Sequence, residues 1–583
     1  MARFFFRRLQ TLFVLFALLF TILGGRMVYI QLLQGPKLSA MGSKIHSQFI
    51  PGEAIPRGDI LDRNGVSLVD LGEREAAVIF PAVLEEEKIP VLSQILQLSA
   101  EKVKDEIIKA KNYYGNNPFI IKTNLTASQV KNIKSNPIQG VYLIPITSRY
   151  GPESLATHLI GHLGLIDQVS WEKFKNKNVS LGASNAYRQD DLIGVKGIEA
   201  IYEDYLRSTV PSYYLQATTD AQGRPLLGLG FKKVLNQDKT TNRNNVVLTI
   251  DKRIQKVLEN IMDQHVLKGA AVILDVSSGE ILASASRPNF NQNEIDKYLN
   301  SNTQTDFLNR ALLHYFPGSV FKVLIAAAAL EENLVDPDEE FVCKGKFEFD
   351  SGVTIPCWNQ EGHGILTFEE ALAHSCNPVF IEVGLRLEAD KIIKYANRFK
   401  LNQDLLVGYP LEDYPSINIE RNSPAALGNA VLGQKGVKLS PLQVASIYAT
   451  IANDGIFYEP SLVKHIKNQE KIIMSFPLNQ GEQIISQNTA KKIKKMLNLA
   501  TLSGTATNAW IEKWGSAGKT STAQTGEQTG TGKEKINVWF AGFAPLDNPK
   551  FAAVIMIEDG ISGGKDAAPV FRQIMEELFA LNI

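Results

Sequence analysis

Residues 246–285, VVLTIDKRIQKVLENIMDQHVLKGAAVILDVSSGEILASA, decide the fold of the larger part of the chain. The β-branched run Val246–Ile250 predicts a strand. The next residues, Asp251–Val266, carry apolar side chains every three to four positions, which is the spacing of an amphipathic helix. Ala270–Asp275 and Glu280–Ala285 are two apolar runs separated by a Val-Ser-Ser-Gly turn, so we expect a β-hairpin. The order strand, helix, hairpin indicates a fold in which helices cover a sheet.

The C-terminal end of the chain supplies the rest of this sheet. Asn537–Phe543 and Phe551–Glu558 are apolar strands joined by a turn that contains two prolines, and Pro569–Leu581 has a helical pattern. Strands at both ends of the region, with a helical middle, indicate an α/β (α+β) fold. We expect an antiparallel sheet with helices on both faces.

Residues 45–235 have a different sequence pattern. Short β-like runs alternate with Gly/Pro turns, and Glu85–Lys111 and Val195–Leu206 are helical stretches. We therefore expect a β-rich N-terminal domain ahead of the α/β domain. The expected divisions are a leader at 1–8, a membrane anchor at 9–33, the N-terminal domain at 34–235 and the C-terminal domain at 236–583.

The N-terminus carries one segment long enough to cross a membrane. The apolar stretch 9–25 follows Arg3, Arg7 and Arg8, and beyond Arg26 the apolar character continues to residue 33. This length matches a bilayer core of about 30 Å, and the basic leader favours a cytoplasmic N-terminus with the rest of the chain outside. The alternative is a cleaved signal peptide, although no clear Ala-x-Ala site follows the apolar stretch.

Composition narrows the classes of function. The 583 residues include 61 basic and 61 acidic side chains, so the chain has no excess of cations for binding nucleic acid. Hydrophobic residues make up 44% and charged residues 21%, which is typical of a folded globular protein and excludes a multi-pass membrane chain. The class of protein that these exclusions leave is a single-pass membrane protein with a large extracytoplasmic body.

The candidate catalytic pair is Ser319 and Lys322. The motif Ser-Val-Phe-Lys begins an apolar helical run at 320–332, which Pro317 and Gly318 precede. One helical turn separates the two side chains, so both project to the same side. A lysine buried at the start of a helix loses proton affinity and can act as a base on a neighbouring hydroxyl. The sequence therefore predicts a serine nucleophile with a lysine base.

Two further motifs follow in the same region. Ser375-Cys376-Asn377 ends an expected helix at 368–374 and offers a hydroxyl to relay a proton and an amide to hold a substrate backbone. Lys519-Thr520-Ser521-Thr522 is a short strand that presents a cation and hydroxyls, which suit a substrate carboxylate. Each motif is weak alone. The order Ser-x-x-Lys, Ser-x-Asn, Lys-Thr-x, over about 200 residues, is the specific signal.

Over nearly its whole length the chain resembles the class B penicillin-binding proteins, and among them the penicillin-binding protein 2 group. Residues 57–65 (RGDILDRNG) resemble the opening of the family's N-terminal pedestal, and 539–545 (WFAGFAP) a motif of its transpeptidase domain. Cys357-Trp358, followed by His363-Gly364, favours the elongation group over the division group. Further stretches that resemble the family are 156–161, 194–206, 249–255, 433–434 and 440–443.

The resemblance implies peptidoglycan cross-linking by acyl transfer, in cell-wall elongation and cell shape. Ser319 would attack the D-Ala-D-Ala carbonyl of a stem peptide, with Lys322 as the base. Ser375 would pass a proton to the departing D-Ala, and Asn377 would hold the donor peptide. The same serine would react with β-lactams, and the chemistry requires no cofactor.

The resemblance also assigns the remaining substrate-binding residues. Lys519 and Thr520 would bind the terminal carboxylate, and the backbone N–H groups of Ser319 and Thr522 would form the oxyanion hole. The family usually has glycine where this chain has Ser521. A hydroxymethyl group there would crowd a ligand that lies flat against the strand, unless strand alternation turns it away. We therefore expect slower acylation by bulky β-lactams.

Other classes of protein use the same chemistry. A β-lactamase or a β-lactam sensor would share the Ser-x-x-Lys pair, but neither needs the long N-terminal domain. A D,D-carboxypeptidase differs only in using water as the acceptor, and a non-catalytic scaffold for wall synthesis would keep only the fold. The resemblance further implies a partner, a multi-pass glycan polymerase of the SEDS type (RodA-like), contacted by the anchor and the residues up to about 50. A plain tether is the alternative.

The three cysteines of the chain, Cys343, Cys357 and Cys376, enclose His363 in the pattern Cys-x13-Cys-x5-His-x12-Cys. Three thiolates and one imidazole make a closed tetrahedral set typical of structural Zn²⁺. Some relatives in the penicillin-binding protein 2 group similarly bind zinc beside the active site. The alternative is a Cys343–Cys357 disulfide, with Cys376 as a buried thiol.

Overall fold

The computed structural model describes residues 2–35, 37–38, 47–181, 186–189, 191–220, 222–236, 243–299, 305–403, 406–411, 414, 416–469, 471–477, 480–528, 532 and 534–582. Two compact units divide the chain. The first comprises Met1–Pro56, Gly72–Arg149 and Thr209–Thr241, and the second Arg57–Leu71, Tyr150–Ser208 and Asn242–Ile583. Two segments that precede residue 235 thus fold with the C-terminal region. The expected division at 235 adjoins 237–242, which lie outside the described residues, and it stays a prediction.

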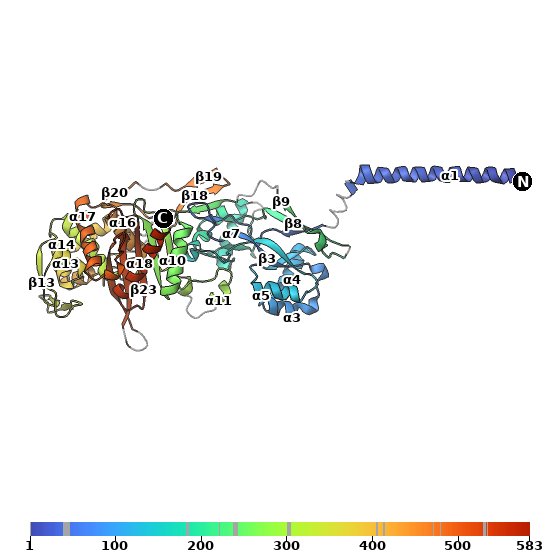
Figure 1. The fold of residues 1–583 in the computed structure, drawn as a ribbon. Coiled ribbons are helices and arrows are strands. Elements are labelled where there is room, and N and C mark those ends of the chain that lie inside the picture. The colour runs from blue at the N-terminus through green and yellow to red at the C-terminus, as the bar shows by residue number, and fades with distance from the viewer. Residues whose placement is uncertain are drawn as a thin grey trace. The chain divides into compact units, whose positions relative to one another are not determined.

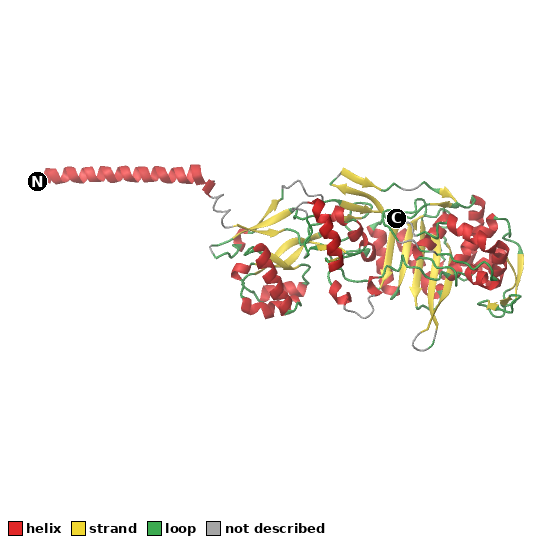
Figure 2. Cartoon of the chain, turned by 180° about the vertical axis from the view of Figure 1, so that it is seen from behind, coloured by secondary structure: helices red, strands yellow, loops and turns green. Residues whose placement is uncertain are grey.

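A five-stranded antiparallel sheet forms the centre of the second unit (Figures 1 and 2). The predicted hairpin is present as β11 and β12, which pair antiparallel. The two strands predicted near the C-terminus, β22 and β23, also pair antiparallel, and β23 lies beside β11. The sheet runs in the order β12 (Ile281–Arg287), β11 (Gly269–Asp275), β23 (Phe551–Glu558), β22 (Glu534–Ala544) and β21 (Ala517–Gln528).

Helices cover both faces of this sheet. The helices α10 (Lys252–His265) and α18 (Ala568–Ala580) share a hydrophobic core with alternate strand residues such as Ile273. Successive strand residues point to opposite faces. The neighbouring Val272 is equally buried, and α16 (Pro441–Ala452) contacts β11, β22 and β23, so the second face is covered as well. The predicted fold class is confirmed.

A buried ion cluster holds the segments 57–71 and 150–208 together within the second unit. The guanidinium of Arg57 pairs with Glu199 at 3.0 Å and with Glu203 at 2.8 Å, and all three side chains are nearly inaccessible to solvent. The Tyr150 hydroxyl donates to Glu199 at 2.7 Å. The second unit also has a four-stranded sheet in the order β19 (Lys471–Ser475), β18 (Val463–Asn468), β10 (Asn245–Leu248) and β2 (Ile60–Leu61).

The first unit contains the three-stranded sheet β4-β3-β5 with helices packed against it. The single helix predicted at 85–111 is instead two helices, because Gln97 adopts a left-handed conformation with φ of +56° and Ser99 caps a new helix by accepting from the Lys102 N–H. The elements are β3 (Gly72–Ile79), α3 (Ile89–Leu96), α4 (Ala100–Tyr114), β4 (Phe119–Lys122), α5 (Ala127–Ser135) and β5 (Val141–Ser148), besides a second sheet of β1 (Ser47–Pro51), β8 (Tyr213–Thr218) and β9 (Phe231–Leu235).

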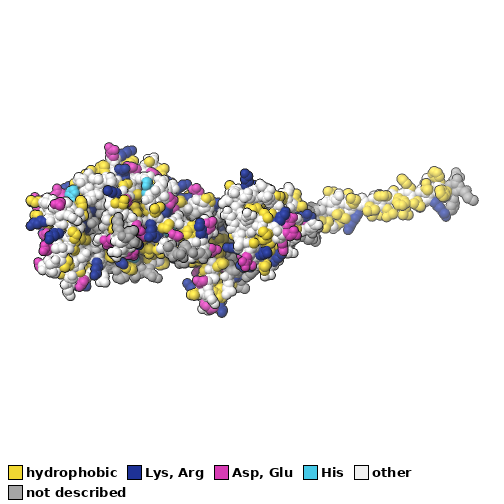
Figure 3. Space-filling view, turned by 90° about the horizontal axis from the view of Figure 1, so that it is seen from below, with side chains coloured by type: hydrophobic (Ala, Val, Ile, Leu, Met, Phe, Trp, Pro, Cys, Tyr) yellow, Lys and Arg dark blue, Asp and Glu magenta, His cyan; other side chains and the backbone are white. Residues whose placement is uncertain are grey.

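The predicted membrane anchor is a continuous helix. It comprises α1 (Ala2–Val28) and a π-helical turn, Tyr29–Gln34. Within the described residues, Phe5–Gln34 is the helix long and apolar enough to span a membrane. Its large hydrophobic side chains are exposed, and Figure 3 shows them along the side of the helix that faces the viewer, as expected of a segment that lipid surrounds.

Candidate active site

Ser319 lies at the start of a buried helix. It belongs to a 3₁₀ turn, Gly318–Phe321, that leads directly into α12 (Lys322–Glu331). Every residue of α12 from Lys322 to Leu330 is buried. Gly318 has φ of +59°, which favours glycine, and a Cβ atom at this position would collide with another side chain. The candidate nucleophile therefore stands on a tightly packed, sterically restricted turn.

Lys322 is fully buried, as the sequence predicted. Its Nζ donates to Asn377 Oδ1 at 2.7 Å, to the Ser375 carbonyl oxygen at 3.0 Å and to Ser375 Oγ at 3.4 Å. Burial lowers the pKa of Lys322 to about 8. About a tenth of the side chains are then neutral at pH 7. The lysine can accept a proton at physiological pH.

Ser375 and Asn377 lie at the junction of two helices, α13 (Phe368–Ala373) and α14 (Asn377–Arg398). Ser375 has φ of +58°, an uncommon conformation for a residue other than glycine, which surrounding structure must hold in place. The Asn377 side chain is fixed at both ends, because Nδ2 donates to the Pro356 carbonyl oxygen at 3.0 Å while Oδ1 accepts from the lysine. These contacts orient the amide oxygen of Asn377 toward Lys322.

The third motif lies on β21, the edge strand of the five-stranded sheet. Lys519 is fully buried, and burial together with the nearby charge of Lys322 holds its pKa well below the usual range. Its Nζ donates to the Thr520 carbonyl oxygen at 3.2 Å and to Thr505 Oγ1 at 3.4 Å. The hydroxyls of Thr520 and Thr505 are 2.9 Å apart. A carboxylate that met Lys519 would relieve the cost of its buried charge.

Ser521 points toward Ser319. Its Oγ accepts a hydrogen bond from the Ser319 backbone N–H at 2.8 Å, and its side chain is only 4% exposed. Strand alternation therefore does not turn the side chain away from the nucleophile. Thr522, the next residue, is exposed, and its Oγ1 accepts from the Gly563 N–H at 3.4 Å.

The structure thus brings all three predicted motifs to one place. Hydrogen bonds connect the first motif to the second through Lys322, and to the third through Ser319 and Ser521. Sequence reasoning missed Thr505, whose hydroxyl joins Lys519 to Thr520. Thr505 lies in a turn and belongs to no motif, so only the fold could identify it.

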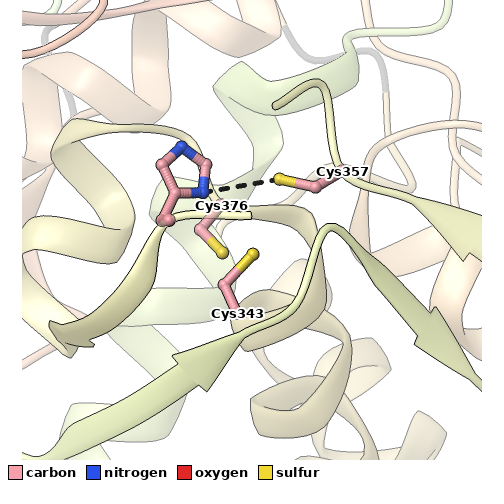
Figure 4. A group of neighbouring side chains, drawn as sticks. Cys343, Cys357 and Cys376 are labelled. Carbon is pink, nitrogen blue, oxygen red and sulfur yellow. Dashed lines mark hydrogen bonds between the residues drawn. The ribbon is translucent and has the colours of Figure 1, made fainter. Parts of the chain in front are cut away.

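The four candidate metal ligands also come together (Figure 4). Their ligand atoms lie within 4.8 Å of one another, and the three thiols are free, so the alternative disulfide is not formed among these described residues. Cys343 ends β13 (Glu340–Cys343), Cys357 follows β15 (Thr354–Pro356), His363 precedes β16 (Gly364–Thr367) and Cys376 is the N-cap of α14.

The chemistry of this set fits a tetrahedral divalent metal. Ligands bound at about 2.3 Å in a tetrahedron are about 3.8 Å apart, and Cys357 Sγ lies 3.6 Å from His363 Nδ1. A hydrogen bond that the Cys376 thiol donates to Cys357 lowers the pKa of Cys357, while the same bond and burial raise the pKa of Cys376. The cluster therefore already favours a thiolate, the form that binds metal.

Comparison with protein families gives two matches. Residues 269–576 match the family described as Penicillin binding protein transpeptidase domain. Residues 53–248 match the Penicillin-binding Protein dimerisation domain. The first match contains all the candidate catalytic, substrate-binding and metal-binding residues.

Curated proteins are similar to large parts of the chain. Stage V sporulation protein D of Bacillus subtilis is 30% identical over 98% of this chain and 85% of its own length. Peptidoglycan D,D-transpeptidase MrdA of Acinetobacter baumannii is 28% identical over 94% of this chain and 84% of its own length. Peptidoglycan D,D-transpeptidase PbpA of Mycolicibacterium smegmatis is 32% identical over 56% of this chain and 71% of its own length. The chain belongs to the class B penicillin-binding proteins.

Proposed function

We propose that the protein is a peptidoglycan D,D-transpeptidase of cell-wall elongation, which cross-links stem peptides through an acyl-enzyme on Ser319. The observation that carries the proposal is the environment of Lys322. This lysine is fully buried, has a pKa of about 8 and is directed at Ser375 and Asn377, at the start of the helix that follows Ser319. The names of the similar proteins MrdA and PbpA support the substrate class.

The acylation step follows from these positions. Neutral Lys322 takes the proton from Ser319 Oγ as this oxygen attacks the carbonyl carbon of the penultimate D-Ala. The C–N bond to the terminal D-Ala breaks, and its nitrogen receives a proton from Lys322 by way of Ser375 Oγ. An ester on Ser319 remains. An amine of a neighbouring stem peptide then attacks the ester, loses a proton and forms the new amide, while Ser319 Oγ recovers its proton.

The donor peptide is held at its carboxylate and at its reacting carbonyl. Lys519 and Thr520 bind the terminal carboxylate, since Lys519 is a buried lysine that has only neutral acceptors among its hydrogen-bond partners in the described residues and would be charged in the presence of an anion. The N–H groups of Ser319 and Thr522 stabilise the oxyanion, a role for which each donor typically contributes about 10²–10³ in rate. Asn377 holds the peptide backbone.

Labelling with a fluorescent penicillin tests this assignment. A stable adduct on the full-length protein that disappears in Ser319→Ala supports a penicillin-binding transpeptidase. Rapid turnover of the adduct would instead indicate a β-lactamase, and the absence of any adduct a non-catalytic scaffold.

We further propose that Cys343, Cys357, His363 and Cys376 hold one structural Zn²⁺. Four protein ligands leave no open coordination position, so the metal would supply rigidity and no reaction step. Cys376 lies between Ser375 and Asn377, and Cys357 follows Pro356, which accepts from Asn377. The four ligands would therefore fix the backbone on both sides of the Asn377 side chain.

The anchor directs the site to the outer side of the cytoplasmic membrane. The basic residues in the first turns of α1 favour a cytoplasmic N-terminus. We propose that the anchor also contacts a SEDS-type (RodA-like) glycan polymerase, which makes the strands to be cross-linked. Exchanging the anchor for an unrelated membrane helix should impair wall synthesis in cells while penicillin labelling persists. If the protein with the exchanged anchor functions fully, the anchor serves only as a tether and the proposed contact is rejected.

A further inference from the structure

The hydroxyl of Ser521 is hydrogen-bonded to a backbone N–H group that the proposed mechanism requires. Ser521 Oγ accepts the hydrogen bond of the Ser319 N–H at 2.8 Å. The same N–H is one of the two donors assigned to the oxyanion. An oxygen atom of the protein thus lies where the oxygen of the substrate carbonyl has to bind.

The packing around Ser521 holds this arrangement in place. On one side, a Cβ at Gly318 would collide with Ser521 Oγ, so the turn and the hydroxyl are in close contact. On the other side, a Cβ at Gly563 would come within 2.6 Å of the Ser521 carbonyl oxygen and 2.9 Å of its nitrogen. Gly563 thus lies close against the Ser521 backbone, and the turn at Gly318 lies close against its hydroxyl. Only rotation about the Cα–Cβ bond can move the hydroxyl away from the Ser319 N–H.

We propose that Ser521 is a gate on the oxyanion hole, a role that rests on the proposed function and adds a specificity residue to it. In the resting enzyme the hydroxyl caps the Ser319 N–H. The side chain must rotate before an acyl donor can place its carbonyl oxygen there. Because the N–H is engaged only after rotation, the gate slows the chemical step for every acyl donor and not only for bulky ones.

The size of the effect follows from the strength of one neutral hydrogen bond. Such a bond holds the closed form in roughly a threefold to tenfold excess over the open form. Removing the hydroxyl should therefore accelerate acylation about threefold to tenfold. A simple steric effect would depend on the size of the ligand, whereas the gate acts equally on a small β-lactam.

The test compares full-length wild-type protein with Ser521→Ala, Ser521→Gly and Ser521→Thr. Stopped-flow measurements with a small and a bulky β-lactam separate the dissociation constant of the initial complex from the acylation rate constant. We expect the Ala and Gly variants to acylate about threefold to tenfold faster with the small β-lactam, at an unchanged dissociation constant. Ser521→Thr keeps a hydroxyl on the same carbon and should stay slow. Any additional gain of Gly over Ala with the bulky β-lactam measures crowding.

A matched control removes a different buried hydroxyl. Ser516 immediately precedes β21, is fully buried and donates to the Ala509 carbonyl oxygen at 2.8 Å. Ser516→Ala should leave the acylation rate unchanged. A general loosening of the strand would accelerate this variant as well, which would contradict a specific role of Ser521.

A boronic acid provides a second readout. Its tetrahedral adduct on Ser319 places an oxygen in the oxyanion hole, so Ser521→Ala should bind it about threefold to tenfold more tightly. Acylation that is unchanged or slower in Ser521→Ala, with the wild type labelled normally, would overturn the gate and leave the proposed function intact. Absence of any adduct in the wild type and in all variants would instead reject the proposed function. If Ser521→Ala does not fold, the acylation rates of Ser521→Gly and Ser521→Thr are compared with that of the wild type instead.

Discussion

Lys322 and Asn377 are joined by a 2.7 Å hydrogen bond from the lysine Nζ to the amide Oδ1. The bond puts a neutral acceptor beside a buried ammonium group. A neutral partner orients the lysine without stabilising its charge as strongly as a carboxylate would. The pKa of Lys322 can therefore stay at about 8, close to the pH at which the base must work.

The first prediction exchanges this partner for a charged one. In Asn377→Asp the new carboxylate favours the ammonium form and raises the pKa of Lys322. The wild-type acylation rate should rise with pH with a midpoint of about 8, and the variant midpoint should lie at least one pH unit higher. At pH 7 the variant should be at least tenfold slower. Penicillin acylation measured from pH 6 to 10 checks both values. Asn377→Ala is the control, since it removes both side-chain contacts of Asn377 without introducing a charge, so its midpoint should not move upward.

The second prediction concerns the stability cost of the same lysine. A pKa that falls from 10.5 to about 8 corresponds to about 3 kcal/mol of unfavourable burial, present in full below pH 8 and relieved as the pH rises to 10.5. Lys322→Met should abolish acylation. Its melting temperature at pH 7 should nevertheless be no lower than that of the wild type.

Thermal unfolding at pH 7 and pH 9.5 measures this directly. The stability of the wild type relative to Lys322→Met should increase between the two pH values. A variant that is less stable by several degrees at pH 7, with no relative change at pH 9.5, would show that the lysine stabilises the fold.

The third prediction concerns the metal. Purified full-length protein should contain one zinc per chain, and three thiols should react after denaturation and chelation. His363→Ala should lose the zinc and acylate more slowly, because the loop that carries Ser375 is less constrained. His374→Ala is the matched control: its ring stacks on His363 but is not in the ligand set, so this variant should retain zinc. Two thiols lost to a disulfide, with no bound zinc, would contradict the proposal.

The fourth prediction concerns the buried ion cluster. Arg57→Met leaves Glu199 and Glu203 buried without their cation, which typically costs about 3–5 kcal/mol. Arg386→Met breaks two partly exposed pairs, with Glu339 and Glu382, and should cost less than about 1 kcal/mol. Melting temperatures of the two variants test the contrast. Equal losses would mean that the cluster does not hold these segments in place.

Much of the fold was predictable because it depends on local patterns. The strands β11, β12, β22 and β23 and the helix α10 have clear apolar periodicity, and each begins and ends close to its predicted residues. The break after Gln97 was missed because the apolar spacing continues across it, although Ser99 is a typical N-cap. The grouping of 57–71 and 150–208 with the C-terminal region depends on contacts far apart in sequence, such as that of Arg63 with Glu280.

In the site, too, local sequence patterns predicted some features and the tertiary structure decided the others. Motif order identified Ser319 and Lys322, and the residue types in the Cys-x13-Cys-x5-His-x12-Cys pattern identified the cysteine cluster. The direction of Ser521 and the part played by Thr505 depend on how β21 lies against its neighbours. No spacing rule supplies that information, since a strand residue can point to either face.

The most direct test of the account is cross-linking by the full-length protein in lipid vesicles. The substrate is uncross-linked peptidoglycan whose stem peptides end in D-Ala-D-Ala, and mass spectrometry counts cross-linked dimers and released D-Ala. We predict one D-Ala released for each cross-link formed, with both products absent in Ser319→Ala and after treatment with penicillin. Release of D-Ala without dimers would show a carboxypeptidase, and dimers that persist in Ser319→Ala would contradict the assignment of the nucleophile.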